Sequence, residues 1–331
     1  MATRNISERR RKLLLGTAAA AGGVLLPHFV RAQGISTRPI RLIIAQAPGT
    51  TPDVIARLLA PRLQARWNQN FVVENRPGAS GAIGMEAVAK AAPDGQTMQI
   101  NVATTVTLPL FYAKLTFDPL ANFQPISFLG STDFVLAVHQ SVPVNNVREW
   151  IAWVKSQPGK LNYATPGLGT HHHLAMELFK QSVGVDIVHV PYKGASGAYT
   201  DFLGGQILTM FLPVHNAVGM SKDGRIRLLA GTMRDRFALG PDLPSLAEAG
   251  VKDFHVESWY GLWGPAGLPA DIVARYNALA RDVIADAETR EALAKAGIVA
   301  RSSTPAELIG IARTEFEMWS RVLKEAGIKP E

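Results

Sequence analysis

A strand, a tight turn and a helix follow one another near the start of the chain, and this order is the strongest constraint on the fold. Residues 40–46 form an apolar, β-branched run of strand length. Residues 55–63 space their apolar side chains by three and four, as a helix with one buried face does. Residues 71–101 repeat this alternation. The pattern predicts parallel strands joined by right-handed crossovers, and therefore an α/β fold.

The turn between the first strand and helix is the first candidate binding site. In open α/β sheets, the loops that leave the carboxyl ends of the strands line the binding crevice. The first backbone N–H groups of a helix lie at the positive end of its dipole and can hold a carboxylate. We expect Asp53 to cap the helix or order water, because two carboxylates repel. The predicted ligand contacts in this turn are Pro48, Gly49, Thr50, Thr51 and, through such water, Asp53.

A second loop of this kind precedes three consecutive histidines. Residues 165–170 end a strand and open a helix, whose positive end can hold a second acidic group. The predicted contacts are Gly167, Gly169, Thr170, His171 and His172. The alternatives are that the glycines serve only the turn geometry and that the histidines are surface residues. Adjacent helical residues point about 100° apart, so we expect no metal site.

Two further loops complete the candidate site. The block at residues 188–194 again ends a strand and begins a helix, so Tyr192, Ala195 and Ser196 are predicted to shape the pocket and supply N–H donors. Lys193 either adds positive charge or is an ordinary solvated lysine. Small and hydroxyl-bearing residues at 103–107 follow the third strand as a loop and contribute Thr104.

Several blocks in the same order carry a resemblance to a known family. They are the first turn, residues 74–81 (Glu-Asn-Arg-Pro-Gly-Ala-Ser-Gly), residues 90–95 (Lys-Ala-Ala-Pro-Asp-Gly) and residues 188–194 (Val-His-Val-Pro-Tyr-Lys-Gly). From about residue 39 to 328, the chain resembles the Bug family of periplasmic solute receptors, which deliver carboxylates to tripartite tricarboxylate transporters. The resemblance implies a two-lobed periplasmic-binding-protein fold of type II, each lobe an open, mainly parallel sheet flanked by helices. With this strand order, it implies that the helix starts after residues 48–53 and 165–170 face each other across the crevice, which suits a ligand with two acidic ends. It also implies a carboxylate ligand, membrane subunits as partners, a monomer and no cofactor.

Departures from the family pattern bear on the ligand. The family commonly has a second glycine where Thr50 stands, and small hydroxyl residues at the first two histidines. After the strand at residues 207–211 it commonly has Asp and Asn, whereas this chain has Leu212 and Pro213. The loss of an acid there predicts an apolar pocket wall that includes Leu212. With Trp259 and Tyr260 nearby in this reading, we expect an aromatic or partly apolar carboxylate, such as an aromatic dicarboxylate.

The first 32 residues have the features of an export signal. Basic residues at positions 9–12 precede an apolar run at 13–26, and Val30-Arg31-Ala32 supplies small residues for cleavage. A twin-arginine signal at Arg10 and Arg11 and an ordinary Sec signal both fit. The apolar run is shorter than the roughly 20 residues that span a bilayer. We expect cleavage near Ala32 and a free periplasmic protein.

Composition narrows the class of protein further. The formal net charge is +7, but residues 1–32 carry +5 of it, so the remainder carries +2 and lacks the basic character of a nucleic-acid-binding protein. The chain has no Cys, which excludes disulfides and a cysteine-linked lipid anchor. The roughly 300 residues after the signal exceed one usual α/β core. We expect one lobe from residues 33–130 and 257–331 and a second from residues 131–256.

Two rival functions remain open. Residues 78–82 and 194–198 approach a nucleophile elbow but lack its last glycine, so a hydrolase-like enzyme would use Ser80 or Ser196. A sensor receptor that feeds a signalling partner would have the same binding chemistry as a transport receptor. We favour a transport receptor without enzymatic activity.

Overall fold

The structure, a computed structural model, describes residues 38–234, 236, 240–325 and 330. The predicted export signal at residues 1–32 lies outside the described residues. Within the described ranges, no helix is both long enough and apolar enough to cross a membrane.

Three parallel strands begin the sheet. β1 (Ile40–Ile44) pairs with β2 (Phe71–Asn75) on one side and β3 (Thr97–Val102) on the other. The connecting helices are α2 (Thr51–Trp67) and α3 (Ala82–Ala89). Because successive strand residues point to opposite faces, Leu42 packs with α2 while Ile43 packs with α3. The alternation of the sequence therefore gives a parallel sheet covered by helices on both faces.

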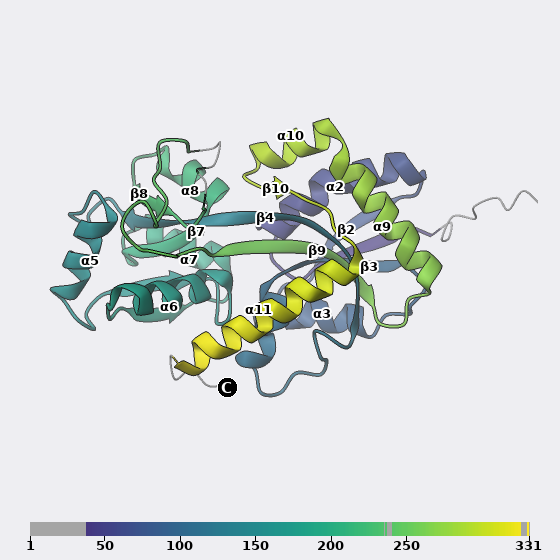
Figure 1. Ribbon diagram of the computed structural model, residues 1–331, viewed down its shortest axis with the longest axis horizontal. Helices are drawn as coiled ribbons and strands as arrows, with labels where there is room; N and C mark the ends of the chain where they lie inside the picture. Colours follow the sequence, from purple (N-terminus) through teal and green to yellow (C-terminus); the bar gives the residue numbers. More distant parts are fainter. Residues whose placement is uncertain (1–37, 235, 237–239, 326–329, 331) are drawn as a thin grey trace, which may run out of the picture. The chain divides into compact units, whose positions relative to one another are not determined.

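Two long strands continue the sheet, as Figure 1 shows where they run side by side. β4 (Phe123–His139) pairs with β9 (Glu257–Pro265) in antiparallel register, and β10 (Val299–Ala300) also pairs with β4. β4 is continuous, with two register shifts along its pairing with β9. β9 is rich in aromatic residues, and Trp259, Tyr260 and Trp263 are all buried between the helices of the two faces.

The second part of the sheet lies at the other end of β4. Its strands are β5 (Asn162–Thr165), β6 (Val188–Pro191), β7 (Thr209–Pro213) and β8 (Ile226–Gly231). The order is β4-β7-β5-β6, with β8 also paired to β4. Its helices are α5 (Val147–Lys155), α6 (His171–Val183), α7 (Ala195–Leu203) and α8 (Val214–Ser221). The proposed boundary between residues 130 and 131 falls inside β4, which runs through it without a break, and the one at 256/257 falls at the start of β9.

Three helices complete the described chain: α9 (Ala270–Ala285), α10 (Ala287–Lys295) and α11 (Pro305–Glu325). Short helical turns are η1 (Ala79–Gly81), α4 (Thr104–Thr107) and η2 (Leu108–Leu110), so the predicted loop at 103–107 is helical. Pro61 lies inside α2 and removes one helical hydrogen bond, yet α2 continues to Trp67. There, the Arg62 guanidinium donates to the Leu58 carbonyl oxygen at 2.8 Å.

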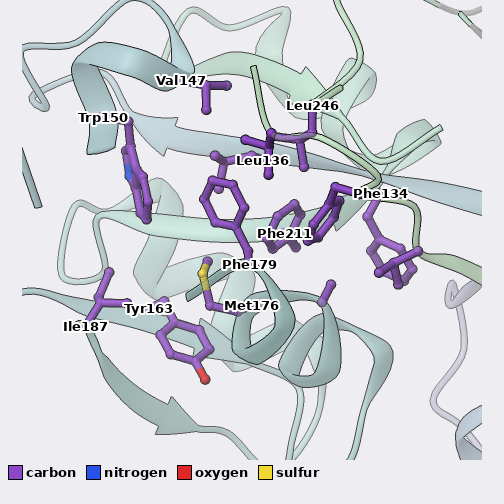
Figure 2. Close-up of a cluster of buried hydrophobic side chains, with 14 of the residues drawn as sticks. Phe134, Leu136, Val147, Trp150, Tyr163, Met176, Phe179, Ile187, Phe211 and Leu246 are labelled. Atoms are coloured by element: carbon purple, nitrogen blue, oxygen red, sulfur yellow. The ribbon is translucent and has the colours of Figure 1, made fainter. Parts of the chain in front are cut away.

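The largest buried cluster fixes α6, the helix that opens at the three histidines (Figure 2). The Phe179 ring on α6 lies 5.3 Å from Trp150, 5.8 Å from Phe211 and 5.7 Å from Phe254, measured between ring centroids. Such aromatic contacts, together with burial of the rings, contribute several kcal/mol to a core. The start of α6 is therefore held on a rigid base.

The cap of α5 gives a first testable consequence. Asn146 Oδ1 accepts the Glu149 N–H at 2.9 Å, and Glu149 Oε2 accepts the Asn145 N–H at 2.6 Å. Asn146→Ala should lower the free energy of unfolding by about 1 kcal/mol, because a helix N–H loses its acceptor. Urea denaturation measures this. Asn145→Ala is the control, since the backbone N–H of residue 145 stays in place; an equal loss in both variants would contradict the cap.

Candidate functional site

A cavity of about 760 Å³ lies where several strand-to-helix loops converge. Its walls come from residues 45–52 after β1, residues 77–81 after β2, and Thr104 after β3. The opposite walls follow β5, β6 and β7. Loops at the carboxyl ends of the strands thus form the cavity, as expected for an open α/β sheet.

Most of the residues predicted as ligand contacts line this cavity. They are Pro48, Gly49, Thr50, Thr51, Thr104, Gly167, Thr170, His171, His172, Tyr192, Ala195 and Ser196. The structure brings together residues that are far apart in the sequence. Their contact with a ligand stays a prediction.

Three of the predicted contacts lie elsewhere. Leu212 is completely buried against α7 and α8, and its neighbour Pro213 lines the cavity in its place. Gly169 is buried, and a Cβ there would meet the Phe111 ring at 2.5 Å. Asp53 is buried behind the first turn.

Asp53 organises the first turn from within the helix. It lies in the first turn of α2 and accepts the Gly49 N–H at 2.9 Å, instead of capping the N–H groups of α2 as predicted. It also accepts from the Arg57 guanidinium at 3.0 Å and the Asn75 amide at 3.0 Å. Burial alone would raise the pKa of Asp53, but these hydrogen bonds and the Arg57 charge lower it below its usual value. Asp53 is therefore a charged support for the turn.

The two predicted turns share the same hydrogen-bond pattern. The Thr50 N–H and hydroxyl both donate to the Ala47 carbonyl oxygen, and those of Thr170 both donate to the Gly167 carbonyl oxygen. Gly49 has φ +79° and Gly169 has φ +72°, as the third position of a type II turn requires. The Gly169 N–H donates to His173 Nδ1 at 3.3 Å, four residues on, as the Gly49 N–H does to Asp53. The two turns are local copies on opposite walls.

Helix starts supply the hydrogen-bond donors of the cavity. In the described part of the chain, no acceptor bonds the backbone N–H groups of Thr51, His171 or His172. These groups lie at the positive ends of α2 and α6. A third start, α7, follows Gly194, whose φ is +128°. The arrangement can hold an anion through backbone donors.

The charges of the lining side chains favour an anion as well. Among the described lining residues there is no Asp, Glu or Arg, and Lys193 is the one side chain of fixed charge, exposed at the rim. Tyr192 donates its hydroxyl to Asp201 Oδ2 at 2.5 Å, and burial followed by this hydrogen bond raises the pKa of Tyr192 to about 12. Tyr192 therefore stays neutral.

Several lining residues were missed from the sequence. Phe134 and Tyr199 add aromatic surface, while Gln46 and Asn216 add amides. Of the two aromatic residues that we expected near the ligand, Tyr260 lines the cavity and Trp259 is buried in the core. Phe134 comes from the middle of β4, where an apolar strand gave no signal of a binding residue.

The hydroxyl of Ser80, one of the two candidate nucleophiles, is held by structural hydrogen bonds. Ser80 Oγ lies 2.8 Å from the Tyr112 hydroxyl oxygen and donates to the Leu168 carbonyl oxygen at 3.1 Å. Neither contact is a base of the kind that activates a serine. The described residues also contain no group of three or more His, Cys, Asp or Glu placed to hold a metal ion.

Comparison with known proteins gives consistent matches. A family model described as the tripartite tricarboxylate transporter family receptor matches residues 55–328. Protein BugT of Bordetella pertussis is 31% identical over 319 residues, covering 96% of this chain and 97% of that protein. The structure of R. palustris Rpa4515 with adipate is similar at a TM-score of 0.85 and 32% identity, covering 89% of this chain and 99% of that chain. The periplasmic binding protein BugD has a TM-score of 0.83 at 29% identity, covering 89% and 100%.

Proposed function

The chain belongs to the family of tripartite tricarboxylate transporter receptors, and we propose that it captures a small organic carboxylate in its cavity and presents it to the membrane subunits of such a transporter. Membership confirms the resemblance to Bug proteins and the two-lobed α/β fold predicted from the sequence. The family is one of solute receptors, not of enzymes. The periplasm is the compartment in which this receptor acts.

The observation that carries the proposal is the polarity of the cavity. Backbone N–H groups at three helix starts surround a space that has no acidic side chain among its described lining residues. Such donors bind a carboxylate without a full positive charge, and ordered water can complete the contacts. Closure of the two lobes around the bound acid would signal occupancy to the transporter.

The proposed ligand is a dicarboxylate. The related protein from R. palustris carries adipate, a linear acid with a carboxylate at each end. Here, two matching turns lie on opposite walls of the cavity, and each precedes a helix start. Phe134, Tyr199 and Tyr260 also line the cavity and together offer a surface for an aromatic ring. We therefore include aromatic dicarboxylates in the proposal.

A thermal-shift screen of aliphatic and aromatic mono- and dicarboxylates tests this function. An acid at a hundred times its Kd stabilises the folded state by about 2.7 kcal/mol, which should raise Tm by about 5 °C for a chain of this size. Amines and sugars of similar size are the controls and should leave Tm unchanged. Absence of a shift with every acid would contradict the proposal.

A further inference from the structure

Two histidines that line the cavity lie close to a third histidine from another helix. His171 and His172 are the first residues of α6, and both line the cavity. The Phe134 ring of β4 stacks on His171, with centroids 6.3 Å apart and planes at 7°. Its centroid lies 5.1 Å from that of His172, edge to face. His215 of α8 is near enough for its charge to affect His172.

Among the described residues, His172 and His215 differ from the other buried histidines because neither ring nitrogen has a partner. In the described part of the chain, both ring nitrogens of His172 and both of His215 are buried without a hydrogen bond. Two other buried imidazoles differ. His173 Nδ1 accepts the Gly169 N–H, and His189 Nε2 lies 2.7 Å from Thr165 Oγ1. Of these two unpartnered imidazoles, His172 lines the cavity. The imidazoles of His173 on α6 and His189 on β6 have partners within the fold.

The two unpartnered imidazoles each carry an N–H donor that lacks an acceptor. Burial first, then the charges of His171 and His215, lower the pKa of His172 to about 3, and burial lowers that of His215 to about 4. Both rings are therefore neutral near pH 7, and a neutral imidazole carries one N–H donor in either tautomer. A buried donor without an acceptor is costly, so an acceptor from the cavity would be stabilising.

The neighbouring charges favour an acidic group as that acceptor. Among the described lining residues, Lys193 is the one side chain of fixed charge, and that charge is positive. The free N–H groups at the start of α6 lie at the positive end of the dipole of this helix. Glu315 of α11, a carboxylate behind this wall, is bonded to His171 Nε2 at 3.0 Å and so is not a free acceptor. Phe134 of β4, which packs against His171 and His172, is apolar and offers no acceptor from its side chain.

We propose that His172, supported by His215, is the specificity determinant for the second acidic group of the ligand. This inference rests on the proposed function, and it assigns the two ends of a dicarboxylate to different walls. One end lies at the turn before α2, where the donors are backbone groups. The other end accepts a hydrogen bond from an imidazole N–H at the start of α6. The site would then distinguish a diacid from the corresponding monoacid.

A double-mutant cycle between protein and ligand tests the assignment by calorimetric titration. The probes are adipate with hexanoate, and benzene-1,4-dicarboxylate with 4-methylbenzoate, pairs that differ by one acidic group. His172→Leu should weaken binding of the better diacid about tenfold or more, as expected for a hydrogen bond to a charged group. Binding of the matching monoacid should change less than about twofold, because that acid has no group for His172 to recognise.

Control variants separate recognition from folding. His172→Gln keeps an N–H donor and should retain most of the diacid affinity, whereas His215→Leu should weaken the diacid less than His172→Leu does. His139→Gln, at the far end of β4 where His139 Nδ1 lies 2.8 Å from Ser141 Oγ, should leave both affinities unchanged. Thermal unfolding without ligand verifies that each variant is folded.

The outcomes distinguish the two proposals. Equal losses for diacid and monoacid, or no loss for either in folded His172→Leu, would overturn the role of His172 while leaving carboxylate capture intact. Failure of the wild-type protein to bind any of the four acids would count against the proposed function and against this inference with it.

Discussion

Gly49→Pro is expected to weaken binding of the best organic acid about 30-fold or more, the cost of losing one hydrogen bond to a charged group. Gly49 has φ +79°, a value that proline, with φ near −65°, does not adopt. Proline also removes the N–H that donates to Asp53 Oδ2 at 2.9 Å. The turn would then move, and with it the donors at the start of α2. Calorimetric titration of the acid identified in the thermal-shift screen measures the effect.

Gly49→Ala is the matched control for this experiment. A Cβ at residue 49 would meet no atom within 4 Å, and alanine keeps the N–H for Asp53. Holding alanine at this positive φ lowers the stability of the turn by about 1 kcal/mol, but the hydrogen bond to Asp53 remains. The affinity of Gly49→Ala for the acid should therefore fall much less than that of Gly49→Pro. Folded Gly49→Pro with wild-type affinity would show that the first turn is not part of the binding site.

The sequence predicted the turns of the site because their signals are local. Pro48-Gly49 between an apolar run and a helical pattern leaves few alternatives to a strand–turn–helix unit. Residues 165–171 have the same kind of proline- and glycine-containing turn before a helical pattern. The parallel order of β1, β2 and β3 follows from that alternation, since a crossover helix joins parallel neighbours. These predictions need only neighbouring residues.

The misplaced residues depend instead on which face of an element is buried. Leu212 and Pro213 are adjacent in β7, and a strand alternates its faces, so one residue decides between core and cavity. Leu212 packs with Val135 and Ala137 against α7 and α8. Asp53 likewise lies within the first turn of α2, beyond the cap position at Thr50. Its side chain points back to Gly49.

Contacts between distant segments were beyond the reach of the sequence. His171 and Glu315 are 144 residues apart, and no local pattern predicts that their side chains meet. α11 is amphipathic, with Trp319 on its buried face. The acidic residue one turn before that tryptophan had no signal to separate it from the exposed Glu317.

Glu315→Ala is expected to lower the free energy of unfolding by about 3 kcal/mol, the range for breaking one side of a buried polar network. The side chain of Glu315 is 13% exposed. Its carboxylate accepts from Trp319 Nε1 at 2.6 Å and Trp259 Nε1 at 3.3 Å, and bonds His171 Nε2 at 3.0 Å. Removal leaves these buried groups without an acceptor. Urea denaturation measures the loss, and Glu317→Ala, on the exposed face, should change stability by less than about 0.5 kcal/mol.

The loss should depend on pH in a defined direction. Burial alone would raise the pKa of Glu315, but the hydrogen bond and charge of His171, then the two indole donors, lower it below its usual value. A carboxyl group with a lowered pKa in the folded state stabilises the protein above its unfolded pKa, and this stabilisation is lost as the pH falls through the folded value. The difference between wild type and Glu315→Ala should therefore be largest near neutral pH and shrink in acid below about pH 4.

A double-mutant cycle with His171→Leu locates the interaction. If Glu315 and His171 act as a pair, the combined loss should fall short of the sum of the single losses by about 1 kcal/mol or more, because each single change already removes their contact. Strict additivity would mean that the indole donors alone account for the role of Glu315. Because α11 packs its Trp319 against the cluster that holds α6, a coupled pair would tie the C-terminal helix directly to the cavity wall at His171.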